Sequence, residues 1–180
     1  MARNDARTAA AFFESYRAAF AYGHMAAILD HFAFPCHITS EAREVTLTPI
    51  ASREEGTHMV EHLLAMYREV GVSTARVLEL ATLEVSPRLH VALVHWALDD
   101  ARGARVYAFE ASYTLASFDD VLRITAIAHN EILRYRECLA QIGDQVTGCL
   151  AARSPLRQCP SSMCPKFLST GARTCSGGLL

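Results

Sequence analysis

One short segment of this sequence has the spacing of a metal-dependent hydrolase. Residues 58–62 read His-Met-Val-Glu-His, which matches the His-x-x-Glu-His pattern of the inverted zinc proteases. On a helix, His58 and His62 lie one turn apart on the same face, as two zinc ligands would. That face continues through Ala65 and Glu69, opposite an apolar stripe, and no third ligand in a suitable context is evident. The sequence therefore favours a solvated helix face over a zinc site.

The six cysteines are the next group that could do chemistry. Cys36 and Cys138 lie in the body of the chain, and the other four lie after residue 148. The N-terminus carries charges of both signs with no apolar segment behind it, so we expect a cytoplasmic protein and no secreted disulfide framework. The closest pair, Cys159 and Cys164, is wider than the Cys-x-x-Cys of structural zinc sites. There is also no Gly-rich phosphate loop and no dinucleotide fingerprint, so we expect no cofactor.

The charge and hydropathy of the chain argue against two classes of partner, nucleic acids and membranes. The 180 residues include 17 Lys and Arg against 19 Asp and Glu, for a net charge of −2. A chain without a basic surplus is a poor binder of the phosphate backbone, so we expect no nucleic-acid partner. No apolar run approaches the roughly 18 residues that span a bilayer, so we expect no membrane insertion.

The first half of the chain predicts three helices and two short strands. Apolar residues at helical spacing indicate a helix over 8–22 and a short second helix over 25–32, which Pro35 should terminate. Two short strands follow at 37–40 and 44–50. Ser52, three residues before a glutamate, forms a capping-box pattern that begins a third helix.

The second half changes to a period of two, which indicates long strands. We expect them at Thr74–Val85, Leu89–Leu98, Arg105–Phe118 and Leu122–His129. In the third of these, Tyr107 and every second residue up to Leu115 should share one buried face. In Leu89–Leu98 both faces are apolar, which is typical of a strand covered on both sides. Helices can cover one side, and we expect a homodimer through the outer sheet face to cover the other.

The last forty residues have a different composition. Residues 141–180 contain no Glu, Tyr, Trp or His and are rich in Ser, Gly, Cys, Pro and Arg. No helical or strand period persists there. We therefore predict one folded domain over residues 1–140 and a disordered low-complexity tail over 141–180.

The order of these elements, three helices and then a long-stranded antiparallel sheet, resembles the nuclear transport factor 2-like superfamily, including its SnoaL-like members. The segments that carry the resemblance are 12–29, 94–103, 112–115 and 122–129, the last matching the closing strand of the family. The similarity covers roughly residues 8–138. It implies an α+β fold in which three N-terminal helices pack in a strongly curved, mainly antiparallel sheet, the cystatin-like cone, around a conical cavity.

The best-known chemistry of that superfamily is only partly matched. Ketosteroid isomerase uses a tyrosine, an aspartate base and a protonated aspartic acid. The resemblance places Tyr16 at the tyrosine, Thr39 near the base and Ala111 near the protonated acid. A threonine cannot remove a proton from carbon at neutral pH, and alanine donates no hydrogen bond. The Asp-Arg-Asp triad of the family's epoxide hydrolase has no obvious counterpart either.

The cone implies a set of side chains that face the cavity. They are Tyr16, Phe20, His37, Thr39, Val94, Trp96, Phe109, Ala111, Tyr113, Ile127 and His129. His37 and His129, with Tyr16, are the candidate catalytic residues, because two histidines could form an acid/base pair like that of scytalone dehydratase. The alternative, commoner in proteins, is that these are hydrogen-bonded core groups.

Two functions of different classes follow. The first is a cone-fold protein that binds a small, largely apolar molecule in its cavity, with isomerase, dehydratase or cyclase chemistry that needs no cofactor if it is an enzyme. The second is a non-catalytic dimerisation or binding module whose cavity is plugged by Phe20, Trp96 and Phe109. The fold alone does not choose between them.

Overall fold

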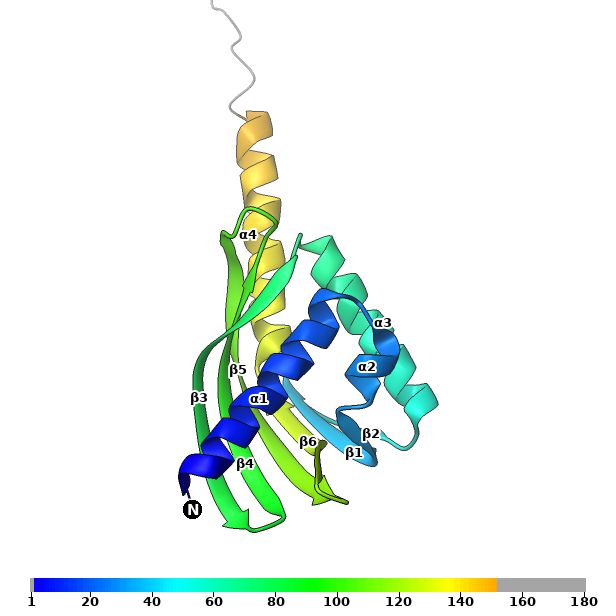
Figure 1. Cartoon of the computed structure of the whole chain (residues 1–180). Coiled ribbons are helices and arrows are strands. Elements are labelled where there is room, and N and C mark those ends of the chain that lie inside the picture. The colour runs from blue at the N-terminus through cyan, green and yellow to red at the C-terminus, as the bar shows by residue number, and fades with distance from the viewer. Residues whose placement is uncertain (1, 152–180) are drawn as a thin grey trace, which may run out of the picture.

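The structure is a computed structural model that describes the backbone of residues 2–151 and the side chains of residues 9–143. Its elements are α1 (Ala2–Ala21), α2 (Met25–Leu29), β1 (Phe32–Glu41), β2 (Val45–Ile50), α3 (Arg53–Glu69), β3 (Thr74–Ser86), β4 (Leu89–Asp99), β5 (Arg105–Phe118), β6 (Val121–His129) and α4 (Glu131–Ala151). Figure 1 shows α1 lying across one bent sheet, with α2 and α3 beside it. The predicted α+β cone is confirmed.

A six-stranded sheet forms the wall of the cone. The strand order is β2-β1-β6-β5-β4-β3, and every neighbouring pair is antiparallel except β1 and β6. The register shifts within the pairs of β1 with β6, β3 with β4, and β5 with β6. Such bulges bend strands and increase their twist, which lets a flat ladder curl around a core.

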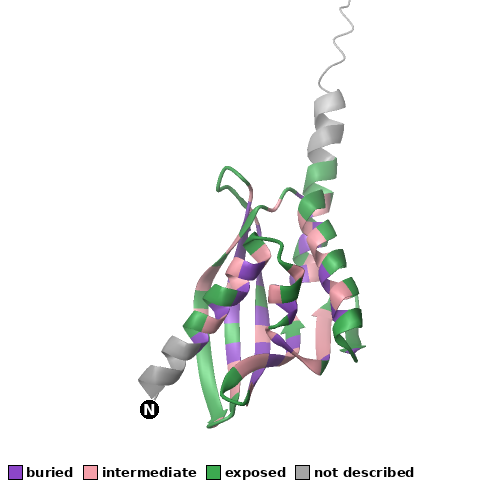
Figure 2. Ribbon diagram, turned by 45° about the vertical axis from the view of Figure 1, so that its right-hand side comes forward, coloured by how far each residue is buried: buried purple, intermediate pink, exposed green. Residues whose placement is uncertain are grey.

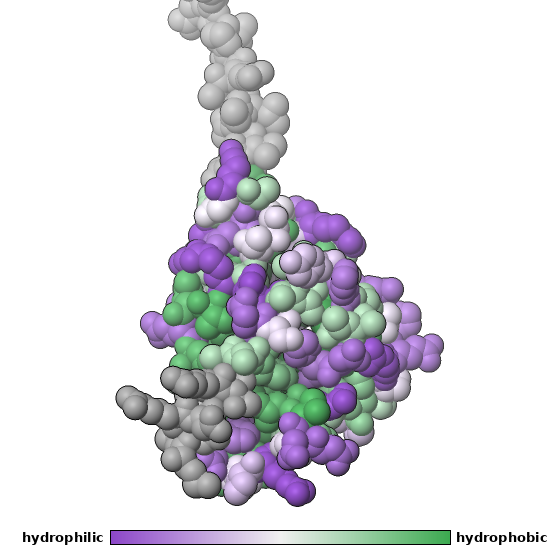
Figure 3. Space-filling view, viewed as in Figure 1, coloured by the Kyte–Doolittle hydropathy of each residue, from purple (hydrophilic) through white to green (hydrophobic). Residues whose placement is uncertain are grey.

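The long strands agree with the sequence period to within one or two residues at each end. Along β5 the buried face consists of Tyr107, Phe109, Ala111, Tyr113 and Leu115, each at most 7% exposed, as predicted. In Figure 2, purple buried segments lie along the central strands of the sheet. On the face that carries α1, hydrophilic side chains surround scattered apolar areas (Figure 3).

Helix α3 begins at the predicted cap and approaches its neighbours closely. The Ser52 hydroxyl accepts a hydrogen bond from the Glu55 amide at 3.3 Å, and the Glu55 carboxylate accepts one from the Ala51 amide at 2.8 Å. A Cβ on Gly56 would lie 2.7 Å from the Phe34 ring, so any other residue there would have to displace this ring.

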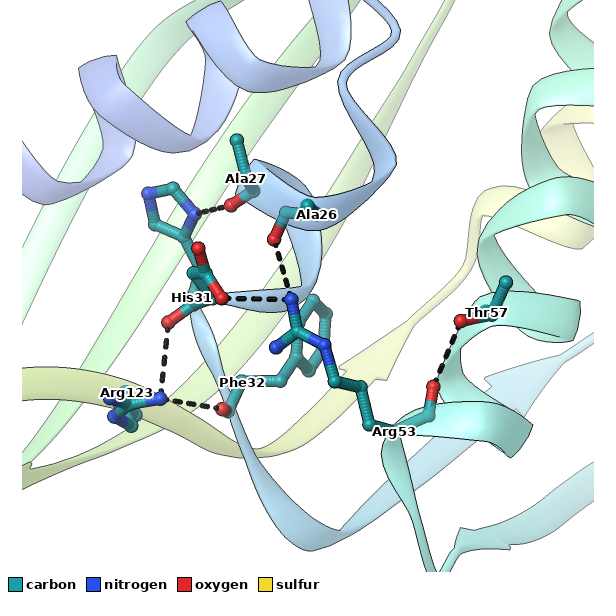
Figure 4. Close-up of polar contacts among 8 residues, drawn as sticks. Ala26, Ala27, His31, Phe32, Arg53, Thr57 and Arg123 are labelled. Atoms are coloured by element: carbon teal, nitrogen blue, oxygen red, sulfur yellow. Dashed lines mark hydrogen bonds and ion pairs between the residues drawn. The ribbon is translucent and has the colours of Figure 1, made fainter.

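The junction between α2 and β1 differs from the prediction. Helix α2 ends at Leu29, and Pro35 lies inside β1, which begins five residues earlier than expected. Two arginines hold this junction (Figure 4). Arg53 donates to the carbonyl of Ala26 at 3.0 Å and pairs with Asp30, while Arg123 donates to the carbonyls of Asp30 and Phe32 at 3.4 Å each. The backbone therefore turns on side-chain contacts from distant segments, which no local pattern reveals.

A fourth helix was not anticipated. Helix α4 starts directly after β6, and its Ile132, Tyr135, Cys138 and Leu139 pack on the core. These positions have the helical spacing of three and four, so the signal was present but was not recognised. The backbone is helical to Ala151, eleven residues into the segment predicted to be a tail, and residues 152–180 lie outside the described residues. Within residues 2–151, no helix is both long enough and apolar enough to cross a membrane.

Candidate ligand cavity

A cavity of about 260 Å³ lies between the inner sheet face, α1, α3 and the start of α4. Eight of the eleven predicted side chains line it: Tyr16, Phe20, Trp96, Phe109, Ala111, Tyr113, Ile127 and His129. The first two come from the apolar stripe of α1 and the rest from alternate positions of β4, β5 and β6. Most of the wall is apolar, as expected for a small-molecule site.

Three predicted residues do not line this cavity: His37 and Thr39 lie on the other face of the sheet, against the prediction, while Val94 lies on the predicted inner face, opposite Ala111. In β1 the residues that line the cavity are Phe32, Ile38 and Ser40, so His37 and Thr39 project from the opposite face of the sheet. A shift of one residue exchanges the two faces of a strand, and the short predicted strand gave no buried anchor to set the alternation. Val94 is 2% exposed but belongs to the packed core and does not line the cavity.

The histidine pair is therefore not formed. His129 lies at the cavity end of β6, where its Nδ1 accepts a hydrogen bond from the Glu131 amide at 3.2 Å, which leaves the ring proton on Nε2. Burial lowers the pKa of His129 to about 4. The ring is neutral at physiological pH, so it offers an N–H donor and no positive charge.

Aromatic side chains form the floor of the cavity. The Trp96 indole N–H donates to the Tyr113 hydroxyl at 2.9 Å, and the ring of Phe13 packs edge-on against Tyr113 with centroids 4.9 Å apart. Tyr16 packs against Phe20, and burial holds the pKa of Tyr16 well above its ordinary value. Among the described residues the Tyr16 hydroxyl has no hydrogen-bond partner, so it is available to a ligand.

The most unusual group in the cavity is a carboxyl that the sequence analysis missed. Glu131, the first residue of α4, lines the cavity and is only 5% exposed. The hydroxyl of Tyr67, from α3, donates to its Oε1 at 2.7 Å, and that of Tyr107, from β5, donates to the same oxygen at 3.3 Å. Burial raises the pKa of Glu131 to about 7, against the opposing effect of the two hydroxyls. Such a group can accept or donate a proton at neutral pH.

The rings of the two tyrosines that donate to Glu131 pack in or against the hydrophobic core. Tyr107 was expected on the buried face of its strand, where its ring does pack, and only the structure brings its hydroxyl and that of Tyr67 to one carboxyl. Glu131 lay in a segment for which no element was predicted. An acidic residue directly after an apolar strand and before a helical apolar period is the signal that could have found it.

The zinc-protease pattern lies on the outside. His58, Glu61 and His62 are all exposed, and the His58 ring lies 3.5 Å from the Glu61 carboxylate. Within the described residues, no cluster of three His, Cys, Asp or Glu side chains could hold a metal ion.

Comparison with known families agrees with this geometry. A family described as NTF2-like protein (DUF6841) matches residues 5–132. This chain belongs to that NTF2-like family. The match ends at Ile132, so Glu131 and the cavity lie within it and most of α4 lies beyond it. No curated protein is significantly similar to the chain.

Solved structures of the same fold are distant in sequence. A domain of unknown function with a cystatin-like fold from Nostoc punctiforme is 16% identical, with a TM-score of 0.55 over 83% of this chain and 96% of that one. A putative calcium/calmodulin-dependent protein kinase II association domain from Xanthomonas campestris is 18% identical, with a TM-score of 0.53 over 69% and 86%. An NTF2-like protein of unknown function from Pseudomonas putida is 10% identical, with a TM-score of 0.54 over 72% and 85%. At these identities the likeness concerns the fold alone.

The buried carboxyl should make the stability of this NTF2-like domain depend on pH. Because the pKa of Glu131 rises from 4.5 to about 7 on folding, the native state holds the proton more tightly. The resulting stability is fully present below pH 4.5 and is lost as the pH rises through about 7, by about 3 kcal/mol in total. Glu131→Gln replaces the carboxyl group with an amide of the same shape, which does not titrate. We expect urea unfolding from pH 4 to 8 to show that the unfolding free energy of the mutant rises relative to that of the wild type as the pH increases from 4.5 to about 7.

The control for this measurement is Glu61→Gln, which removes an exposed carboxylate from α3. Its unfolding free energy should follow that of the wild type at every pH. Curves for Glu131→Gln and wild type that run parallel from pH 4 to 8 would show that Glu131 titrates normally.

Proposed function

We propose that this protein binds a small, largely apolar molecule in its cavity, with one polar group of the ligand placed against Glu131. The observation that carries the proposal is the Glu131 carboxyl, 5% exposed in an otherwise mainly apolar space. Proteins rarely bury a carboxyl without a use for it, because removing the charge from water is costly. The free Tyr16 hydroxyl and the Nε2–H of His129 supply further hydrogen-bond donors at the same cavity.

The volume of the cavity supports an occupant over a plugged cone. Phe20, Trp96 and Phe109, which would have to fill the space in a plugged module, lie in its wall and leave about 260 Å³ open. This is just below the range of about 300–1,000 Å³ typical of ligand pockets, which favours a small ligand.

A larger side chain in the cavity wall should weaken the binding of a small apolar ligand. Ala111→Leu adds three carbons at a lining position of β5, and we expect it to weaken a small apolar probe such as cyclohexylmethanol by about tenfold or more. Titration calorimetry or ligand-detected NMR measures the affinity. Ala11→Leu, the same change at an exposed position of α1, is the matched control and should bind as the wild type does. Equal affinity in all three proteins would place the probe outside the cavity.

Proton transfer without a cofactor is the second candidate function. It is favoured by the pKa of Glu131, about 7, which suits a general acid or base at neutral pH. This carboxyl would take the role that the sequence assigned to His37 and His129. It would serve the isomerase, dehydratase or cyclase class of reactions, in which a carbon-bound proton is removed or moved.

A generic probe tests this chemistry without knowledge of the substrate. A base that removes the C3 proton of 5-nitrobenzisoxazole opens the ring, as the C–H electrons form a nitrile and the N–O bond breaks to a coloured phenolate. We expect a rate that rises with pH through about 7, as Glu131 ionises, and falls by about 100-fold or more in Glu131→Gln. His37→Ala should keep the full rate. A rate unaffected by Glu131→Gln would exclude this role.

We also propose that the protein is a homodimer through the outer face of the sheet. All the helices lie on the inner side, and the outer face exposes Leu47, Leu83 and Leu93 by 57–66%. Leu83 and Leu93 lie on the neighbouring strands β3 and β4, and Leu47 lies on β2 at the opposite edge of the same face. Exposed apolar side chains gathered on one face are typical of an interface. A twofold dimer needs only one such surface, because each copy presents it to the other.

Sedimentation tests the dimer directly. The wild type should sediment as a dimer at micromolar concentration, and Leu93→Glu should sediment as a monomer, because it would bury a charge opposite its own copy. Ala11→Glu, on α1 away from this face, should remain dimeric. A wild-type protein that is monomeric under these conditions would contradict the proposal.

A further inference from the structure

We propose that the ligand of the cavity is a small organic cation, a protonated amine on an apolar body, whose ammonium group pairs with the Glu131 carboxylate. This inference rests on the binding function proposed above and specifies the chemical class of the ligand. It follows from three features of the cavity: a buried carboxylate, the absence of a positive charge paired with it among the described residues, and aromatic walls.

The first feature is the contrast between the two buried carboxylates of this protein. Asp99 and Glu131 are the acidic residues below 9% exposure among those described, at 2% and 5%. Asp99 has two arginine partners, Arg76 and Arg105, and the Arg76 guanidinium holds its pKa below the ordinary value. Glu131 has none, and only hydroxyls donate to it. A buried carboxylate normally has a cationic partner, and here that place is open to a ligand.

The arrangement at Glu131 keeps one oxygen for that partner. Both tyrosine hydroxyls, from Tyr67 and Tyr107, donate to Oε1, so Oε2 is left for a further donor. The N-terminal position of Glu131 in α4 and the two hydroxyls favour the charged form of the carboxyl. Burial opposes it, and an ammonium group in contact would remove that penalty.

The second feature is the charge of the groups that face Glu131 from every surrounding element. Tyr16 on α1, Tyr67 on α3 and Tyr107 on β5 are neutral, because burial raises the pKa of each. His129 on β6 is neutral, because burial lowers its pKa to about 4. Glu131 therefore sets the sign of the charge at this end of the cavity.

The one arginine at the cavity does not compensate for Glu131. Arg17 lines the cavity, but its guanidinium makes two hydrogen bonds to the Glu14 carboxylate, one of them Nε to Oε2 at 3.0 Å. His62, at the cavity mouth, is exposed on α3. An anionic ligand would meet the uncompensated carboxylate and be repelled, whereas a cation would be attracted.

The third feature is the aromatic wall. The ring of Tyr16 has its centroid 5.0 Å from that of Phe20 and 6.4 Å from that of Trp96, and Phe20 lies 6.4 Å from Tyr67. These rings enclose one space beside Glu131. Ring faces attract a cation placed within about 6 Å, and the attraction grows when water is excluded. Aromatic rings around one carboxylate are a combination suited to an alkylammonium ion.

Three probes of the same shape and different charge test the proposal by titration calorimetry. They are cyclohexylmethylamine, cyclohexylmethanol and cyclohexanecarboxylate. At pH 8 we expect the amine to bind at least about tenfold more tightly than the alcohol, and the carboxylate to bind most weakly. The amine should tighten by up to tenfold for each pH unit between 5 and 7, as Glu131 ionises, and then level off. The affinity of the alcohol, which carries no charge, should change with pH much less than that of the amine.

Variants separate this proposal from the general binding function. Glu131→Gln should lower the affinity for the amine at least tenfold more than the affinity for the alcohol, which can still form a hydrogen bond with the amide, while Glu61→Gln should change neither affinity. If the alcohol binds wild type as tightly as the amine does, the cation proposal is wrong and the binding function stands. If none of the three probes binds, both are wrong. The pH series on the wild type decides the question even if Glu131→Gln fails to fold.

Discussion

The alternation of side chains across one bent sheet is the constraint on which the rest of this structure depends. Every second residue of β4, β5 and β6 points to the inner side, and bulges curl the strands so that these side chains converge. Figure 1 shows α1 lying across this bent sheet, and side chains from α1, α3 and the start of α4 close the volume on that side without filling it. The remaining space is the cavity, so the same bend that builds the core also creates the site.

The polar groups at the ends of the strands have different kinds of partner in different parts of this fold. At the start of β1, arginines hold a turn together through carbonyl groups, and at the end of β4 arginines neutralise Asp99. At the junction of β6 and α4, Glu131 is equally buried but has only hydroxyl donors. This loses stability above the pKa of the carboxyl, and natural proteins accept such losses where a site needs the group.

Glu131 reaches the cavity from a different element than the two acids of ketosteroid isomerase would, according to the resemblance. The resemblance to ketosteroid isomerase places the two acids of that enzyme at Thr39 and Ala111. In this chain Thr39 faces outward, and the side chain of Ala111 has no polar group. The acid enters from a different element, the first turn of α4, and reaches the cavity beside β6. An acid at one end of a cone can thus be supplied by the sheet or by a following helix, and the two positions meet a ligand from different sides.

The sequence by itself determined the parts of this protein that depend on local periodicity. The ends of β4 and β5, the buried face of β5 and the cap at Ser52 all follow from the spacing of apolar residues and from one capping pattern. The cone itself was implied by the resemblance of this order of elements to the nuclear transport factor 2-like superfamily. Eight of the eleven predicted cavity residues come from these regular stretches.

Tertiary structure alone decided the rest. The face on which His37 and Thr39 lie is set by the pairing of β1 with β6, across about ninety residues of chain, and one residue of register exchanges the two faces. The ionisation of Glu131 depends on burial by α3 and β5, which lie far from it in sequence. Periodicity reports which side of an element is apolar, whereas a site depends on which elements meet, and that is a property of the folded chain.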